Sequence, residues 1–436
     1  MQRPPAPTLV AAVVLVLSVS VVGAAMVTAE QPTDGGATAA ADATPESSAR
    51  GQTLVGVQAY GWFGNDNGSA RVVSPEGAVV WEWAPENGRV FDVESLSNGD
   101  ILASVGVAET DCPAPYDERD PCVHNRVVQL AYPDQRIVWE YDWYDAFPNH
   151  HEVHDADRLP SGETAIVDMG NDRAFTVTEA GVISWQWNAS EHIGAGTPFF
   201  DQYVPENQRS AFTRAGPEAD WTHMNDIDRL ANGNFQLSIR NFDVLLEVDP
   251  RTDAIVDVVG RPASRQTIHQ QHNPMRLGET VLVADSENDR VVELDVETDE
   301  LVWEYDGTGS GQRLQWPRDV DRLPNGNTLI TDSRNFRVLE IDANGTVVWE
   351  YSMRAERGIA YEADRLGAAE EDDGTARVEY RSRTSGGLVG GPIATVNSWL
   401  GFVPFLPAWL GMVELVASLL AVGASIALGS RWRARR

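Results

Sequence analysis

Lysine is absent from this 436-residue sequence, so all 33 of its basic side chains are arginine, against 65 aspartates and glutamates. The formal net charge is −32 at pH 7. A surface this acidic repels a phosphate backbone, which disfavours nucleic acid as a partner. It also repels itself in dilute buffer, whereas in 1 M salt the Debye length falls to roughly 3 Å. The composition therefore predicts a protein adapted to concentrated salt, from an extreme halophile.

Cysteine is almost absent as well. Cys112 and Cys122 are the only two, and they flank a loop that contains proline and aspartate. Two ligands are too few for a structural metal site, which takes four. The pair instead predicts a local disulfide and an oxidising compartment outside the cytoplasm.

Long hydrophobic runs occur only towards the two ends, at 9–27 and 410–428, and the second runs into four arginines. Arginine-rich flanks favour the cytoplasmic side, so the sequence predicts a protein of the cell membrane whose middle part is extracytoplasmic and whose C-terminal tail is cytoplasmic. It leaves open whether the first run is cleaved. The expected segments are 1–28 as a signal peptide or membrane anchor, 29–51 as a disordered linker, 52–356 as the folded domain, 357–398 as a second linker, 399–430 as a transmembrane region and 431–436 as the basic tail.

Helical periodicity is missing before residue 400, and a phrase of the form Asp-x-Asp-Arg-Leu-x-x-Gly recurs instead. It stands at 155–163, 226–234 and 319–327, with looser copies at 92–100 and 273–280. The residue before each copy, which we call the slot residue, is in turn Phe91, His154, Asn225, His272 and Arg318. The arginines inside the phrase, such as Arg158 and Arg322, are expected to pair with neighbouring aspartates.

Each phrase is followed by alternating strands and a closing Trp-Glu-Tyr-like strand, which occurs at 81–83, 139–141, 185–187, 303–305 and 349–351. Compact units repeat every 45 to 48 residues, as Gly233, Gly278 and Gly326 show. This period and the all-β pattern predict a six-bladed β-propeller, closed by residues 51–83, with the closing tryptophans between blades. Longer gaps predict insertions at 111–125 and 192–220 that can wall or lid the centre.

In a propeller the first strand of every blade lines the centre, so the slot residues and their near neighbours should converge at one mouth. His150 is as compatible with an ordinary turn as with the mouth, and His124 and His192 are expected on the surface. Arginine and histidine with few carboxylates suit an oxyanion, whereas Arg240 and Arg318 would repel a metal cation, so no cofactor is expected. The expected mouth residues are His151, His154, His223, Asn225, Arg240, His269, His272 and Arg318.

The stretches 150–160, 221–230, 271–274 (Gln-His-Asn-Pro) and 319–327 resemble the arylsulfotransferase (arylsulfate sulfotransferase) family, and the acidic, anchored chain resembles a haloarchaeal member. The resemblance covers residues 54–352. It implies a six-bladed propeller that moves a sulfuryl group from an aryl sulfate to a phenol through a sulfohistidine. His272 resembles the nucleophile, and His154, His223 and Arg240 resemble the other catalytic residues.

The same resemblance implies substrate contacts for Asn225 and Arg318, and we add His151 and His269 as further expected substrate contacts. The family's Lys-Thr step is absent, and Trp316-Pro-Arg-Asp stands in its place, so Arg318 is expected to replace the lysine. His154 is expected to protonate the departing phenolate and then deprotonate the incoming phenol.

Two other functions stay open. One is a non-catalytic extracellular propeller that binds an anionic ligand or a glycan, since a fold alone does not decide function. The other is a metal-dependent hydrolase or lyase, which would hold a divalent metal and lose activity with a chelator.

Overall fold

The computed structural model describes residues 51–59, 68–117, 121–146, 149–216, 219–307, 312–353 and 358–367. The hydrophobic ends expected to be an anchor and a transmembrane region lie outside these residues. Within the described part of the chain, no helix is long and apolar enough to cross a membrane.

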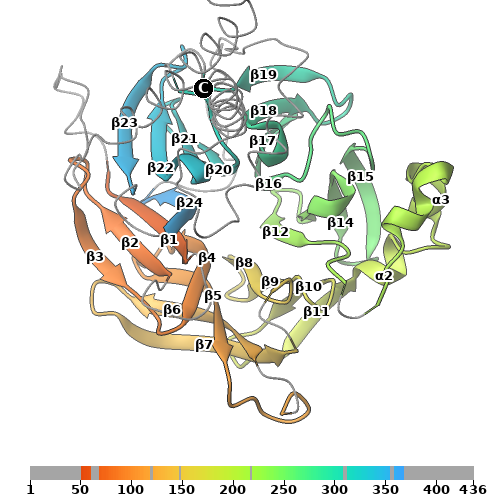
Figure 1. Ribbon diagram of the computed structural model, residues 1–436, viewed down its shortest axis with the longest axis horizontal. Helices are drawn as coiled ribbons and strands as arrows, with labels where there is room; N and C mark the ends of the chain where they lie inside the picture. The colour runs from red at the N-terminus through yellow and green to blue at the C-terminus, as the bar shows by residue number, and fades with distance from the viewer. Residues whose placement is uncertain are drawn as a thin grey trace, which may run out of the picture. The chain divides into compact units, whose positions relative to one another are not determined.

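Six four-stranded antiparallel sheets form a ring, and each is a blade of a propeller (Figure 1). The predicted six-bladed all-β propeller is therefore confirmed. Five blades are simple meanders, and the first strand of each lies nearest the centre. They are β4 (Gly88–Ser95), β5 (Ile101–Glu109), β6 (Cys122–Ala131) and β7 (Arg136–Asp145); β8 (Val153–Arg158), β9 (Thr164–Asp168), β10 (Arg173–Val177) and β11 (Ile183–Asn188); β12 (Met224–Arg229), β13 (Phe235–Ile239), β14 (Val244–Asp249) and β15 (Ala254–Gly260); β16 (His272–Leu277), β17 (Thr280–Asp285), β18 (Arg290–Asp295) and β19 (Leu301–Tyr305); and β20 (Pro317–Arg322), β21 (Thr328–Asp332), β22 (Arg337–Ile341) and β23 (Val347–Ser352).

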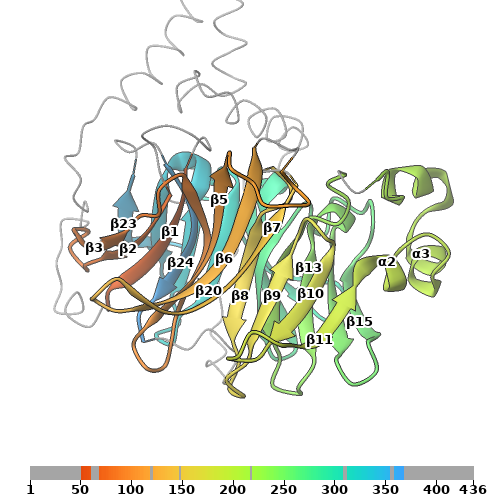
Figure 2. The same ribbon diagram turned by 90° about the horizontal axis from the view of Figure 1, so that it is seen from below.

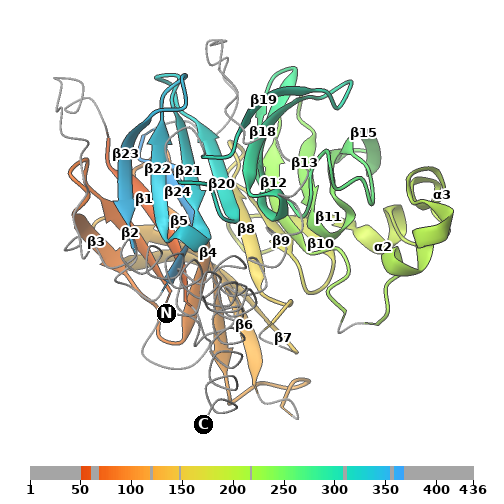
Figure 3. The same cartoon turned by 45° about the horizontal axis from the view of Figure 1, so that its top comes forward.

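The sixth blade closes the ring with both ends of the folded domain. Its outer strands are β1 (Thr53–Ala59), β2 (Ser69–Val73) and β3 (Val79–Trp83), and its innermost strand is β24 (Gly358–Arg365), which pairs with β1 (Figure 3). The predicted closure by residues 51–83 is therefore confirmed for three strands. The fourth strand, β24, lies beyond residue 356, so the propeller extends past the expected boundary. This strand contains a sixth, divergent copy of the phrase, Tyr361-Glu-Ala-Asp-Arg-Leu-Gly367.

The phrase builds the turn between the first two strands of a blade. Its glycine adopts a positive φ, for example +84° at Gly162 and +82° at Gly326, which residues with a side chain rarely adopt. The arginine of the phrase contacts the preceding blade, where Arg322 forms an ion pair with Glu293 at 2.9 Å. Arg158 lies over the ring of Trp139 at 4.5 Å, and Arg322 lies over Trp303 at 5.2 Å, in each case on the closing strand of the preceding blade. These arginines thus connect neighbouring blades. Trp303 is buried between two blades, as the sequence predicts.

The first of the two expected insertions is a loop closed by a disulfide between Cys112 and Cys122. The predicted disulfide is therefore confirmed. The second contains α2 (Ala189–His192), α3 (Pro198–Tyr203) and the 3₁₀ helix η2 (Glu206–Phe212). Its helices lie at the outer edge of the ring, not over the centre (Figures 1 and 2), because Phe199 and Phe212 pack into the core between two blades. The end of this insertion, at Asp220, contacts a slot neighbour, His223.

Candidate active site

At five of the six slots a β-bulge turns the slot residue out of the strand ladder. In β8 Val153 pairs with Asp168 and Asp155 pairs with Val167, so His154 has no partner across the ladder. A bulged residue is left unpaired and its side chain is re-aimed, here towards the centre of the ring. The residues skipped in this way are Phe91, His154, Asn225, Arg318 and Tyr361, while in β16 the irregularity directly follows His272.

Four rings from four blades lie together, two of them, His154 and Tyr361, at bulged slots. The ring centroids are 5.2 Å apart for His154 and His223, 6.5 Å for His223 and His272, 6.0 Å for His272 and Tyr361, and 5.6 Å for Tyr361 and His154. Phe91 stacks on the far side of His154 at 4.8 Å. Slot residues far apart in the sequence therefore meet, as the repeat predicts.

His272 is held in one tautomer. Its Nδ1 is 2.8 Å from Oγ of Ser286, and this hydroxyl donates to the carbonyl of Pro317 at 2.6 Å. Because the single hydroxyl proton is used there, Oγ accepts from Nδ1–H, and Nε2 carries the lone pair. Burial, followed by the charges of Arg318 and Arg240, lowers the pKa of His272 well below its usual value. The imidazole is therefore neutral and nucleophilic near neutral pH.

Arg318 lies directly in front of this lone pair. Its Nη1 donates to Nε2 of His272 and, at 2.9 Å, to the hydroxyl of Tyr361. The guanidinium lies over the ring of Trp316 at 3.5 Å, and its buried Nε has no hydrogen-bond partner among the described residues. Burial lowers the pKa of Arg318 to about 10, so it stays charged. A cation with an unused donor thus faces the nucleophile.

Arg240 and Asn225 add two more polar groups. Arg240 donates to Asn241 at 2.9 Å and to Gln270 at 3.1 Å, and its charge is among the causes that lower the pKa of His272. Asn225 donates to the carbonyl of Gln271 at 2.9 Å. The buried Nε of Arg240 and the buried Oδ1 of Asn225 have no hydrogen-bond partner within the described ranges. Unused donors and acceptors in a buried place are typical of a ligand site.

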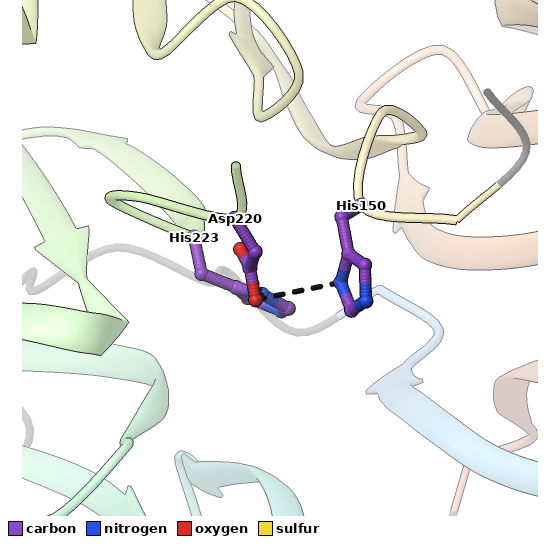
Figure 4. A group of neighbouring side chains, drawn as sticks. All are labelled: His150, Asp220 and His223. Carbon is purple, nitrogen blue, oxygen red and sulfur yellow. Dashed lines mark hydrogen bonds and ion pairs between the residues drawn. The ribbon is translucent and has the colours of Figure 1, made fainter. Parts of the chain in front are cut away.

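His223 is oriented by a carboxylate. Its Nδ1 is 2.9 Å from both oxygens of Asp220, and one of these oxygens is 3.4 Å from Nδ1 of His150 (Figure 4). Burial outweighs the carboxylate and lowers the pKa of His223 to about 4, whereas the charges of His223 and His150 hold the pKa of Asp220 below its usual value despite burial. In the described part of the chain, these three residues alone place three possible metal ligands within 4.8 Å of one another.

His154 is neutral too. Burial, then the charges of His223 and Arg318, lowers its pKa well below 6.5. Its Nδ1 lies 3.3 Å from the carbonyl of Val153, so Nδ1 carries the proton and Nε2 can accept one. His154 is therefore in the neutral form that the second of its two expected steps, deprotonation of the incoming phenol, requires.

The other histidines have carboxylate, arginine or aromatic neighbours. His151 pairs with Asp145 at 3.1 Å, and this carboxylate raises the pKa of His151 against the effect of burial. His269 is half-buried near Arg265 and Arg240, and burial followed by those charges lowers its pKa to about 4. His124 is bound between Glu109 and Asp142, and His192 stacks on Trp187 at 4.8 Å.

Three site residues are missing from the expected set. Tyr361 occupies the sixth slot, and the Ala-Asp-Arg-Leu-Gly that follows is the signal that identifies it. Asp220 lies three residues before His223, and no sequence motif marks it as a partner of that histidine. Ser286 begins the 3₁₀ helix η4 (Ser286–Asn288), and its role depends on a contact across blades that no local pattern marks.

Residues 89–272 match the model of the arylsulfotransferase (ASST) family. The match contains His154, His223, Asn225, Arg240 and His272, and it ends before Arg318 and Tyr361. No curated protein matches the chain.

Among solved structures, a protein of unknown function from Bacteroides caccae aligns at 16% identity and a TM-score of 0.49, covering 72% of this chain and 98% of its own. A virginiamycin B lyase from Staphylococcus aureus aligns at 10% identity and a TM-score of 0.39, covering 68% and 84%. The WD40 β-propeller domain of Doa1 aligns at 12% identity and a TM-score of 0.41, covering 72% and 89%. These similarities do not bear on activity.

Proposed function

We propose that this protein transfers a sulfuryl group from an aryl sulfate ester to a phenol by a ping-pong mechanism through a sulfohistidine at His272. The observation that carries the proposal is the neutral His272, whose Nδ1–H is bound by Ser286 and whose Nε2 faces the Arg318 guanidinium. The family match supports sulfuryl transfer in general.

In the first half-reaction the ester would bind with its sulfuryl oxygens against Arg318 and Arg240, whose unused Nε donors suit such a ligand. Asn225 would contact the sulfuryl group through its Nδ2 amide, which carries a second hydrogen to donate. Arg318 Nη1 would pass from Nε2 of His272 to a sulfuryl oxygen. The lone pair of Nε2 then forms the N–S bond while the S–O bond to the aromatic ring breaks, and its electron pair leaves on the phenolate. The sulfohistidine keeps Nδ1–H on Ser286.

In the second half-reaction a phenol oxygen attacks the sulfur, and the N–S electron pair returns to Nε2. His154 takes the phenol proton, because it is neutral with Nδ1–H on a carbonyl. This proton is passed to the phenolate released in the first half-reaction, directly or through solvent. The overall reaction therefore consumes and releases no net proton. His223, oriented by Asp220, would contact the sulfuryl group from the side of the third blade.

The test uses the full-length protein in molar salt with 4-nitrophenyl sulfate and excess phenol. We expect nitrophenolate release that depends on phenol, a labelled His272 when phenol is omitted, and loss of both in His272→Ala. The exposed Arg251→Ala serves as a control variant, because its side chain bonds only Asp249. Wild-type transfer by a folded His272→Ala protein would refute the assignment.

A metal-dependent hydrolase or lyase is the second candidate, and the group of His150, Asp220 and His223 favours it. Two imidazoles and a carboxylate are a common ligand set for zinc and iron. It predicts one tightly bound transition metal and loss of activity with a chelator, neither of which sulfuryl transfer requires. Metal content of the purified protein and a chelator series separate the two candidates.

We also propose that the propeller lies outside the cytoplasmic membrane. The disulfide between Cys112 and Cys122 supports this placement, because such bonds persist in oxidising compartments. Protease accessibility of the propeller in intact cells tests it, and protection there would contradict it.

A further inference from the structure

A ring of hydrogen bonds from side chains to backbone joins neighbouring blades. At four of the six slots, the carboxylate directly after the slot accepts the backbone N–H of the second residue after the slot in the next blade. The pairs are Asp92 with Ala156 at 3.0 Å, Asp155 with Ile227 at 2.5 Å, Asp319 with Ala363 at 2.9 Å and Glu362 with Val93 at 3.1 Å. These bonds supply hydrogen-bond donors to several of the buried carboxylates that the repeated phrase places near the centre.

The ring is broken at Asp226. The residue that would donate to it in the next blade is Pro274, which has no N–H. Asp226 is only 6% exposed, and its Oδ1 has no hydrogen-bond partner among the described residues. A buried carboxylate oxygen without a donor is costly, and such groups are normally paired or bind a metal ion.

A cavity of about 240 Å³ lies at this break, with Asp226 and Pro274 in its wall. Two arginines also line it, but Arg229 lies over Phe235 at 4.6 Å and Arg276 donates to Gln236 and Glu247. Burial, followed mainly by mutual repulsion, raises the pKa of Asp226 well above its usual value. The other acids of the wall are Asp155, Asp157, Asp228, Asp319, Asp321 and Glu362.

We propose that this acidic chamber binds one hydrated divalent cation of the hard class, Ca²⁺ or Mg²⁺. Carboxylate and amide oxygens, including that of Asn273 in the wall, are the ligands such ions prefer. In the described ranges no three chamber acids place ligand atoms within 4.8 Å of one another, so water must lie between the ion and most of them. At roughly 30 Å³ per water, the cavity has room for such a hydrated ion.

The proposal does not depend on sulfuryl transfer, so it is tested by binding. The full-length protein, stripped with chelator in KCl buffer, is titrated calorimetrically with CaCl₂ and with MgCl₂, and its Tm is followed. We expect saturable binding of one ion per chain and a Tm that rises by a few degrees at saturating ion. Asp226→Asn should weaken binding roughly tenfold, because ligand charge sets affinity in such sites.

Two variants separate the chamber from general electrostatics. Pro274→Ala supplies the missing N–H to Asp226 without changing any charge, and it should also weaken binding. Asp92→Asn is the matched control, because Asp92 has the same place in the phrase but already accepts from Ser104 and Ala156 and lies outside the cavity wall. Absence of binding, equal weakening by Asp92→Asn and Asp226→Asn, or loss of binding in His150→Ala would each overturn the proposal.

Discussion

Removing the Ser286 hydroxyl should impair the nucleophile without touching it. In Ser286→Ala, Nδ1–H of His272 loses its acceptor and the Pro317 carbonyl loses its donor. Partners of this kind fix the tautomer of a histidine, and their loss typically costs about 10- to 100-fold in activity, or roughly 1.4–2.7 kcal/mol in the barrier. We expect kcat/KM for 4-nitrophenyl sulfate to fall by that factor. The buried groups left unpaired should also lower stability by about 1–3 kcal/mol.

The chain offers a matched control in the adjacent blade. Ser333 begins the 3₁₀ helix η6 (Ser333–Asn335) and donates to the Ala360 carbonyl at 2.7 Å, which is the same inter-blade contact beside a slot that holds Tyr361. Ser333→Ala should therefore lose similar stability and keep its kcat/KM. Ser286→Thr, which keeps the hydroxyl, should restore activity. If Ser286→Ala and Ser333→Ala lose the same fraction of kcat/KM at matched stability, the tautomer argument is refuted.

Three further outcomes follow from the structure. The kcat/KM for the ester should stay level through pH 6.5 and fall only at lower pH, because burial lowers the pKa of His272 well below 6.5 and protonation removes the nucleophile only as pH falls through that lowered pKa; an inflection near 6.5 in the pH profile would contradict this. Arg240→Ala should lower kcat by about 10²–10³-fold with little change in Tm, as loss of one anion-stabilising donor does, and unchanged kinetics would exclude Arg240 from the site. Replacing Cys112 and Cys122 by serine should cost up to about 3 kcal/mol of unfolding free energy in denaturant titrations and leave kcat/KM unchanged, since neither cysteine is among the groups expected to contact the ester.

Much of the architecture follows from the repeat, because ring symmetry turns a shared position in the sequence into a shared position in space. His154, Asn225, His272 and Arg318 could thus be grouped without any structure. The sequence marks the sixth slot less clearly, since Glu362 replaces the first aspartate of the phrase and no closing Trp-Glu-Tyr strand follows. Closure by β24 makes such a strand unnecessary, because β1 to β3 already supply the rest of that blade.

The contacts across blades could not be predicted. Arg158 lies over Trp139 and Ser286 donates to the Pro317 carbonyl, yet neither pair has a local pattern, because both depend on how adjacent sheets pack against each other. The pKa of His154 also depends on burial and on charges from other blades, so its protonation state does not follow from the repeat alone. Sequence periodicity gives the position of a side chain in the ring, and its protonation state follows only from the assembled surroundings.

Tyr361 tests whether the divergent sixth slot belongs to the site. Its hydroxyl accepts from Nη1 of Arg318 at 2.9 Å, and burial raises its pKa to about 12, so it stays a neutral phenol. In Tyr361→Phe the ring keeps its packing on Phe91 and His272, but Nη1 retains only Nε2 of His272 as an acceptor. Arg318 should then block the nucleophile more firmly.

One neutral hydrogen bond is worth about 1 kcal/mol, so kcat/KM for the ester should fall roughly fivefold in Tyr361→Phe while Tm changes little. Steady-state kinetics and a melting curve on the same preparation measure both. A variant as active as wild type would show that Arg318 leaves His272 without help from the sixth slot. A loss of activity with an intact fold would mean that the strand that closes the ring also completes the site, so closure of the propeller and assembly of the anion site would be one event.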